Sequence, residues 1–234
     1  NDGEDFVAAF HRIGCILENI KRPGPAGTAA HILVEDYIPG TEVALEGLLE
    51  DGRLRTLALF DKPDPLEGPH FEETIYLTPS QLDAALRDGI ADAVTHAAAA
   101  LGFGFGPVHA EARINDAGVW IVEVAARSIG GLCARVLRFG AGISLEELII
   151  QHALGRDPAS LQREHTPAGV MMLPVPCPGV LYEVRGQAET RALPAIVDLQ
   201  ITIAPGTEVR PLPNGDRYLG FLFARADTAE EVEA

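Results

Sequence analysis

The chain has 234 residues, with 18 basic and 34 acidic side chains and a net charge of −16. Proteins bind nucleic acid through clustered Lys and Arg, so this balance argues against a nucleic-acid partner, and no uncharged apolar run is long enough to cross a membrane. The three cysteines, Cys15, Cys133 and Cys177, are too widely spaced for a disulfide framework or a zinc site, which predicts a reducing, cytoplasmic location.

The first elements are a helix, a loop and a strand. Apolar residues at helical spacing predict a helix over residues 5–21, and the Pro- and Gly-rich segment 22–27 ends it as a loop. Residues 31–35 predict a buried strand. Because the chain starts at Asn rather than Met, directly before a helix, we expect it to begin within a larger protein.

A β-hairpin is predicted over residues 42–61, about the Asp51-Gly52 turn. Its alternation indicates that one side is core and the other is not. The opposite face would pair Glu50 with Arg53 at the tip and Glu42 with Asp61 at the base. The predicted core face consists of Val43, Leu45, Leu49, Leu54, Ala58 and Phe60.

The middle of the chain predicts one short strand and three helices. Residues 72–77 are the strand, and a helix starts at Pro79-Ser80 and runs through residue 100. Helical patterns follow at 132–139 and 144–154. These elements predict an α+β fold, in which antiparallel hairpins carry helices on one side.

Composition changes near residue 157, after which Val, Leu, Ile, Pro and Gly dominate. We therefore expect a first domain over residues 1–162 and a small β-rich domain over 163–234. The predicted strands of the second domain are 169–173, 180–184, 196–203 and 218–226.

A second predicted hairpin, over residues 107–125, carries the candidate chemistry. Residues 115–118 fit a three-residue loop with Gly118 in the left-handed position. The register that this loop predicts pairs Glu111 with Glu123, Arg113 with Ile121, and His109 with Ala125.

The two faces of this hairpin differ sharply. The polar face holds His109, Glu111, Arg113 and Glu123. Two carboxylates directly opposite each other repel, and Mg²⁺, which takes one or two carboxylates, would remove the conflict. The alternative is a solvent-exposed face on which Arg113 neutralises one carboxylate. The predicted core face is Val108, Ala110, Ala112, Ile114, Trp120, Val122 and Val124.

The residues after this hairpin favour the metal interpretation. Arg127 follows Glu123 by four residues, and the segment 128–131 (Ser-Ile-Gly-Gly) lets the backbone turn back toward the site. A fixed cation beside a metal and phosphates stabilises the charge that develops in phosphoryl transfer.

With these motifs in this order, residues 5–155 resemble the ATP-grasp superfamily. Segment 34–42 (VEDYIPGTE) is similar to the segment that links the two lobes gripping ATP. Taken alone, Glu35 would be an ordinary strand-end carboxylate. The resemblance implies the following adenosine contacts: Glu35 to the adenine amino group, the backbone of Tyr37 and Ile38 to the adenine edge, and Glu42 to the ribose hydroxyls.

By the same resemblance, Glu111 and Glu123 match the family's pair of magnesium ligands, for which Mn²⁺ could substitute, and Arg113 stands among the nucleotide contacts. Ala125 replaces the family's usual third metal ligand. The pattern Glu-x-Ala-Ala-Arg followed by a Gly-containing loop is similar to bacterial L-amino acid ligases of the bacilysin-synthesis type. This implies that Arg127 contacts the reacting phosphoryl or acyl group.

The resemblance to these ligases also implies a substrate site. Glu73 would bind the α-amino group of the first amino acid, and Gly131 would leave room for a bulky side chain. Lys62 would reach a phosphate or be a surface lysine, and His109 would relay a proton or orient its neighbours. Residues 179–232 resemble the small C-terminal domain of these ligases. The expected substrate-site residues are Glu73, Tyr76, Ser128, Gly130 and Gly131.

The implied activity is an ATP-dependent carboxylate–amine ligation through an acyl phosphate, with a dipeptide-type product. The alternatives are an ATP-grasp ligase of another pathway, such as purine biosynthesis, and a nucleotide-binding module without turnover. The family's N-terminal α/β domain and phosphate-binding segments do not appear in this sequence, so we expect an inactive fragment of an active enzyme. The expected partners are small molecules, and the sequence does not specify an oligomeric state.

Overall fold

The computed structural model describes residues 3–19, 31–65, 71–140, 142–156, 162–212 and 214–234. The chain divides into two units, residues 1–38 and residues 39–234, and each is described by itself. None of the helices among the described residues is long and apolar enough to cross a membrane.

In the first unit, helix α1 (Gly3–Asn19) confirms the helix predicted over 5–21. The loop predicted at 22–27 lies outside the described residues. The strand predicted at 31–35 is wrong, because these residues have no regular secondary structure. A strand needs a neighbour to complete its hydrogen bonds, and the described part of this unit holds no strand that could pair with them.

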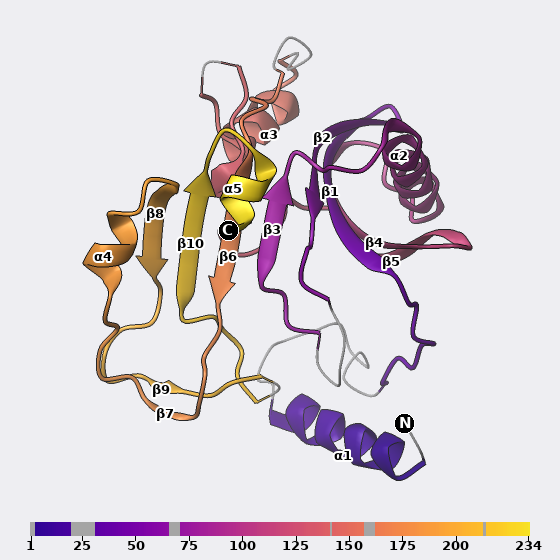
Figure 1. Ribbon diagram of the computed structural model, residues 1–234. Helices are drawn as coiled ribbons and strands as arrows, with labels where there is room; N and C mark the ends of the chain where they lie inside the picture. Colours follow the sequence, from indigo (N-terminus) through magenta and orange to yellow (C-terminus); the bar gives the residue numbers. More distant parts are fainter. Residues whose placement is uncertain (1–2, 20–30, 66–70, 141, 157–161, 213) are drawn as a thin grey trace. The chain divides into compact units, whose positions relative to one another are not determined.

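The second unit is built on an eight-stranded antiparallel sheet with the order β5-β4-β1-β2-β3-β6-β10-β8 (Figure 1). A two-stranded ribbon, β7–β9, accompanies it. The strands are β1 (Thr41–Glu50), β2 (Arg53–Asp61), β3 (Ile75–Thr78), β4 (Gly106–Asn115), β5 (Gly118–Ala125), β6 (Ala168–Leu173), β7 (Gly179–Val180), β8 (Ile196–Ile201), β9 (Glu208–Val209) and β10 (Gly220–Arg225).

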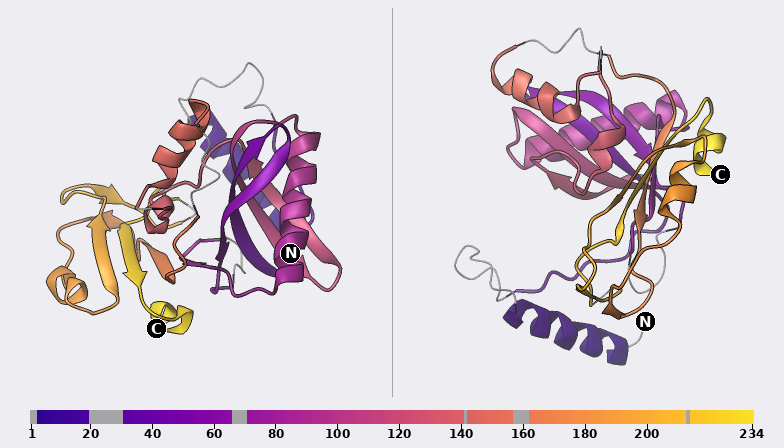
Figure 2. Two further views of the ribbon diagram at one scale, coloured as in Figure 1. Left: turned by 90° about the horizontal axis from the view of Figure 1, so that it is seen from above. Right: turned by 90° about the vertical axis from the view of Figure 1, so that its left-hand side faces the viewer.

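Helices pack on both faces of this sheet, not on one as the sequence suggested. Helix α2 lies against the β2, β4 and β5 part, while the short 3-10 helix and α3 pack into the cluster on the other face (Figure 2). The reason is that β1 is a central strand, buried along almost its whole length. The helices of the unit are α2 (Ala84–Ala100), the 3-10 helix (Cys133–Val136), α3 (Leu145–Ala153), α4 (Gln187–Arg191) and α5 (Ala229–Glu233).

The sheet runs through the domain boundary expected at 162/163. Strand β6 pairs with β3, with Tyr76 opposite Val170, so strands after the boundary extend the sheet formed before it. The strand predicted at 180–184 is reduced to the two residues of β7. The division into two domains therefore remains a prediction.

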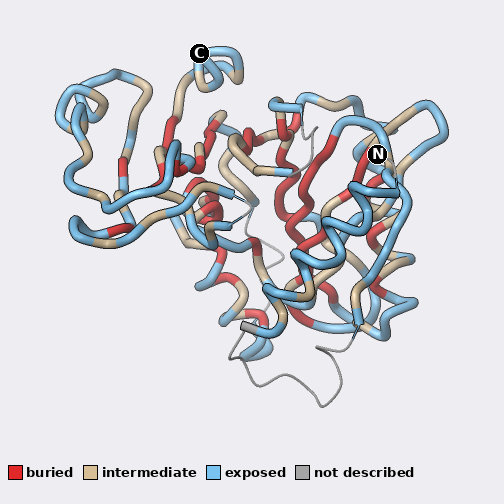
Figure 3. The backbone as a smooth tube through the Cα atoms, turned by 90° about the horizontal axis from the view of Figure 1, so that it is seen from below, coloured by how far each residue is buried: buried red, intermediate tan, exposed pale blue. Residues whose placement is uncertain are grey.

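The first hairpin has the predicted turn but a different register beyond it. Glu50 pairs with Arg53 as expected, whereas a bulge after Glu46 places Asp61 opposite Val43 rather than Glu42. The extra residue moves the side chains of β2 beyond the bulge to the opposite face of the sheet, because strand side chains alternate between faces. Ala58 and Phe60 consequently join the cluster on the other face from Val43, Leu45 and Leu49, and both sides of the hairpin are core (Figure 3).

The second hairpin confirms the predicted register at its open end. Glu111 lies directly opposite Glu123, as expected. The turn holds two residues instead of three, and a bulge after Glu111 compensates. The other informative pairs are His109 with Ala125, Arg113 with Trp120, Ile114 with Val119, and Asn115 with Gly118.

Because of this bulge, the core face of β5 differs from the predicted one. Val119 and Ile121 pack against the cluster under α2, together with Val124. Trp120 and Val122, which were expected in the core, are 45% and 47% exposed. A one-residue shift inverts every side chain between the bulge and the turn.

Helix α2 begins later than predicted. Its N-cap is Asp83, whose side chain accepts a hydrogen bond from the Leu86 N–H at 2.9 Å. Pro79 and Ser80 belong to the preceding connection. The carboxylate satisfies one of the N–H groups that a helix start leaves unpaired. The helix therefore begins after Asp83 and not at Pro79-Ser80.

We expect Asp83→Ala to lower the free energy of unfolding by about 0.5–2 kcal/mol, since the Leu86 N–H loses its acceptor. Asp88→Ala, at an exposed position in the second turn of the same helix, is the matched control. Urea unfolding of the 234-residue chain measures both. Equal effects of the two substitutions would contradict the capping role.

Candidate functional site

The two candidate metal ligands face one another on the β4–β5 ribbon. Glu111 is 15% exposed at its side chain and Glu123 is 50% exposed, so the pair lies at the border between the interior and solvent. The alternative was that the whole polar face of this hairpin is exposed to solvent. It is wrong for His109 and Arg113, which are both buried. A buried charge persists only when it is paired and hydrogen-bonded, and the contacts below supply those partners.

Lys62 lies among three carboxylates. Its Nζ contacts Glu42 Oε1 at 2.7 Å, Glu73 Oε1 at 2.8 Å and Glu111 Oε1 at 3.0 Å. The lysine is 4% exposed, so the surface-lysine alternative is wrong. Burial alone would lower the pKa of Lys62, but the charges of Glu111 and Glu73 outweigh it and raise the pKa to about 12. The ammonium is therefore a permanent cation whose three donors are all engaged.

The carboxylates around Lys62 have further partners. Glu42, which is buried, accepts a second hydrogen bond from Arg113 Nε at 2.8 Å, so Arg113 neutralises a carboxylate of β1 rather than one of its own hairpin. Tyr76 donates its hydroxyl to Glu73 at 2.5 Å. Burial is the main cause that raises the pKa of this phenol, which keeps it a donor. Both Glu42 and Glu73 are thus held in fixed positions.

His109 bridges two acids. Its Nδ1 contacts Glu46 Oε1, and its Nε2 lies 3.6 Å from Glu111 Oε1. Burial opposes the charged imidazole, but the contacts with Glu111 and Glu46 raise the pKa of His109 to about 9. Burial likewise opposes ionisation of Glu111, whereas His109 and Lys62 lower its pKa to about 2. At neutral pH the site is a network of formal charges.

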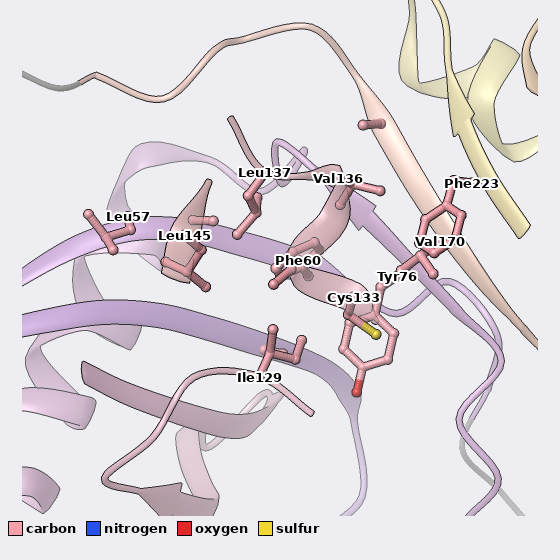
Figure 4. Packing of buried hydrophobic residues seen from close by; sticks show 14 of the residues in the cluster. Leu57, Phe60, Tyr76, Ile129, Cys133, Val136, Leu137, Leu145, Val170 and Phe223 are labelled. Carbon is pink, nitrogen blue, oxygen red and sulfur yellow. The ribbon is translucent and has the colours of Figure 1, made fainter. Parts of the chain in front are cut away.

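The loop after β5 brings Arg127 beside the ribbon. Its Nη2 contacts Glu123 Oε1 at 3.2 Å, and its Nη1 donates to the Ser128 carbonyl at 2.9 Å. The arginine is half exposed, so this ion pair is available for exchange with another anion. Ile129 anchors the loop in the core, close to Cys133 and Tyr76 (Figure 4).

These side chains border a cavity of about 210 Å³. Three of its lining residues, Met172, Tyr218 and Phe221, come from the C-terminal part of the chain, in which the sequence showed no chemical signature. Glu46 was also missed, although an acid inside the apolar run of β1 is a visible signal. The lining residues are Glu73, Tyr76, His109, Glu111, Glu123, Arg127, Ile129, Gly130, Gly131, Cys133, Met172, Tyr218 and Phe221.

Gly131 lies at the cavity and has a backbone conformation that favours glycine. Its φ is +60°, and a Cβ there would lie 3.1 Å from Cε1 of Phe221. A bulky residue at 131 would therefore strain the loop before it narrowed a substrate pocket. The expectation that Gly131 leaves room for substrate remains a prediction.

We expect Gly131→Ala to lower the free energy of unfolding by about 1–3 kcal/mol, because a non-glycine residue is disfavoured at positive φ. Gly130→Ala is the matched control, since its Cβ would meet only Arg127 Nη1 at 3.9 Å. Thermal or urea unfolding compares the two variants. A control as destabilised as Gly131→Ala would contradict the backbone argument.

The ribbon and its surroundings offer carboxylate oxygens, the ligand type that a hard divalent cation prefers. Glu42, Glu73 and Glu111 have oxygens within 4.8 Å of one another, a spacing suited to a metal, but the Lys62 ammonium already lies within 3.0 Å of each. The opposed pair Glu111 and Glu123 is a different arrangement, with one partner half exposed. Carboxylates of this kind are what Mg²⁺ binds alongside phosphate oxygens and water.

The expected adenosine contacts are divided between the two units. Glu35, Tyr37 and Ile38 belong to the first unit, and Glu42 belongs to the second. Within the second unit, Glu42 is engaged by Lys62 and Arg113. The nucleotide roles of all four residues remain predictions.

Comparisons with known proteins agree with this architecture. Residues 1–136 match the ATP-grasp domain family, and residues 171–234 match the L-amino acid ligase C-terminal domain 2 family. The chain belongs to the ATP-grasp family.

Three relatives illustrate the relationship. The crystal structure of L-amino acid ligase from Bacillus licheniformis is similar at 30% identity and a TM-score of 0.73, covering 84% of this chain and 51% of that one. Alanine–anticapsin ligase from Bacillus subtilis is 26% identical over 64% of this chain and 34% of its own length. The crystal structure of phosphoribosylglycinamide synthetase from Anaerococcus prevotii is similar at 16% identity and a TM-score of 0.68. The match covers 85% of this chain and 51% of that one, and it shows a shared fold alone.

The chain spans about half the length of that L-amino acid ligase and about a third of the alanine–anticapsin ligase. Another relative, the uncharacterized protein y4rH of Sinorhizobium fredii, is 24% identical over 88% of this chain and 42% of its own length. The activity of the whole protein is accordingly a proposal.

Proposed function

We propose that this chain is the metal- and substrate-binding part of an ATP-dependent ligase that joins an amino acid to another amine through an acyl phosphate. The observation that carries the proposal is the opposed pair Glu111 and Glu123, bordering one cavity with Glu73 and Arg127. Support for an amino-acid substrate comes from the C-terminal family match at residues 171–234, a segment that supplies part of the cavity wall.

In this proposal Glu111 and Glu123 hold magnesium, with Mn²⁺ as a substitute. ATP and magnesium would supply phosphoryl activation of a carboxylate, with charge spread over phosphate oxygens. The residues of this chain provide position and electrostatics. Lys62 and His109, each bound to Glu111, fix that carboxylate in its ionised form.

The other site residues have distinct proposed roles. Arg127, already close to Glu123, stabilises the negative charge that develops during phosphoryl and acyl transfer. Glu73, at the cavity and 34% exposed, binds the α-amino group, with Tyr76 orienting it. His109 is enclosed between two acids, which supports an orienting role over proton relay. A cytoplasmic location is part of the proposal.

A screen of amino-acid pairs against the complete protein tests this function. We expect ADP and phosphate to form only when ATP, Mg²⁺ and a suitable pair of amino acids are present, with a dipeptide detected by mass spectrometry. Turnover with a purine-pathway carboxylate or amine instead would favour the second class of ligase. Binding of ATP and Mg²⁺ without ADP formation under any pair would indicate a binding module.

A further inference from the structure

Glu46 is a buried carboxylate to which neither the sequence nor the proposed mechanism gives a role. It lies in β1, is 2% exposed, and has the apolar neighbours Leu45 and Leu48 in the same strand. Burying an acid costs free energy unless hydrogen bonds replace its water. This one has two partners, one at each oxygen, and both belong to elements of the candidate site.

The first partner is His109 on β4, whose Nδ1 contacts Glu46 Oε1. This contact fixes the orientation of the imidazole, because it leaves the opposite ring nitrogen, Nε2, toward Glu111 Oε1 at 3.6 Å. Glu46 therefore decides which edge of the imidazole meets the candidate metal ligand.

The second partner is the Ile129 amide, which donates to Glu46 Oε2 at 3.0 Å. Ile129 is 8% exposed and is the anchor of the loop that carries Arg127. A buried backbone N–H needs an acceptor, and Glu46 supplies it here. The same carboxylate thus ties the loop with Arg127 to the strand with His109.

An irregularity of the sheet lies beside Glu46. The extra residue of the β1–β2 bulge is Leu57 of β2, opposite the step from Glu46 to Gly47 in β1. A bulge changes the direction in which neighbouring side chains point, and such features recur beside active sites. A Cβ at Gly47 would lie 2.6 Å from Leu54 Cδ1, so a larger residue there would require the Leu54 side chain to move.

We propose that Glu46 is a positioning residue of this site: one carboxylate oxygen holds the His109 ring with Nδ1 toward β1 and Nε2 toward Glu111, and the other holds the Arg127 loop through the Ile129 amide. It touches no reacting atom and acts through His109 and Ile129. The consequence for turnover rests on the proposed ligase function, whereas the positioning itself does not.

The first test needs only the 234-residue chain. Nitrogen-15 NMR of the histidine rings is expected to show a hydrogen-bonded Nδ1–H on His109, and hydrogen exchange is expected to show a protected Ile129 amide. In Glu46→Gln the side-chain amide can donate to Nδ1, so the His109 ring-nitrogen shifts and the Ile129 amide shift should both change. Glu50→Gln, at the exposed end of the same strand, should leave both signals unchanged.

The His109 and Ile129 signals of the wild-type chain decide the question even if Glu46→Gln fails to fold. A His109 ring with a bare Nδ1, or an Ile129 amide that exchanges like an exposed loop amide, overturns it. Unchanged His109 and Ile129 signals in a folded Glu46→Gln chain also overturn it.

The second test uses the complete protein. Glu46→Gln should lower kcat about 10- to 100-fold, as loss of a group that orients a metal-site residue does. KM for ATP should stay within about threefold, because the lost interaction acts on the chemical step. An unchanged kcat would overturn the role in turnover. If the wild-type enzyme ligates no amino acids, the proposed function fails, while the NMR result still decides the positioning.

Discussion

Glu123→Gln should reduce turnover of the complete enzyme by more than about tenfold, a loss of at least ~1.4 kcal/mol in transition-state stabilisation. The substitution removes the charge from one of the two carboxylates that face each other across the β4–β5 ribbon. An amide oxygen is a much weaker ligand for Mg²⁺ than a carboxylate oxygen. Steady-state release of phosphate with a saturating amino-acid pair measures the effect.

The same variant should be almost as stable as the wild type. Glu123 is half exposed, and its ion pair with Arg127 contributes at most about 1 kcal/mol. Asp116→Asn, in the exposed turn of the same hairpin, is the matched control and should retain full turnover. More than a tenth of the wild-type rate in Glu123→Gln would contradict the metal assignment.

Lys62→Met should lower the free energy of unfolding by about 3–5 kcal/mol, the cost of leaving buried charges without their partner. Three carboxylates, from Glu42, Glu73 and Glu111, share the lysine ammonium within 3.0 Å. Without it they repel one another at short range. Urea unfolding of the 234-residue chain at neutral pH measures the loss.

Two companion experiments identify the cause of that loss. Millimolar Mn²⁺ or Mg²⁺ should stabilise Lys62→Met more than the wild type, because the vacated position between three carboxylates suits a divalent cation. Adding Glu73→Gln to Lys62→Met should recover part of the stability by removing one repelling charge. Arg53→Met, at the exposed tip of the first hairpin, is the control. A loss below about 1 kcal/mol for Lys62→Met would show that the ammonium does not hold this cluster together.

The sequence by itself determined the elements whose signals are local. Alternation and a short turn placed Glu111 opposite Glu123, and the order of motifs indicated the ATP-grasp fold that the family match bears out. Helix α3 also begins as predicted, with Ser144 as its cap. The Glu111–Glu123 pair and the start of α3 each follow from residues within one hairpin or one helical turn, and the family resemblance follows from the order of several such motifs.

Only the tertiary structure decided the features that depend on neighbours distant in sequence. The bulges opposite Glu46 and Glu111 reverse part of each predicted core face, because one extra residue inverts the side chains beyond it. The enclosure of Lys62 joins residues 20, 11 and 49 positions away in the chain. The two partners of Glu46 were likewise visible only in the structure. His109 and the Ile129 amide follow Glu46 by 63 and 83 residues, and no sequence spacing predicts contacts over such distances.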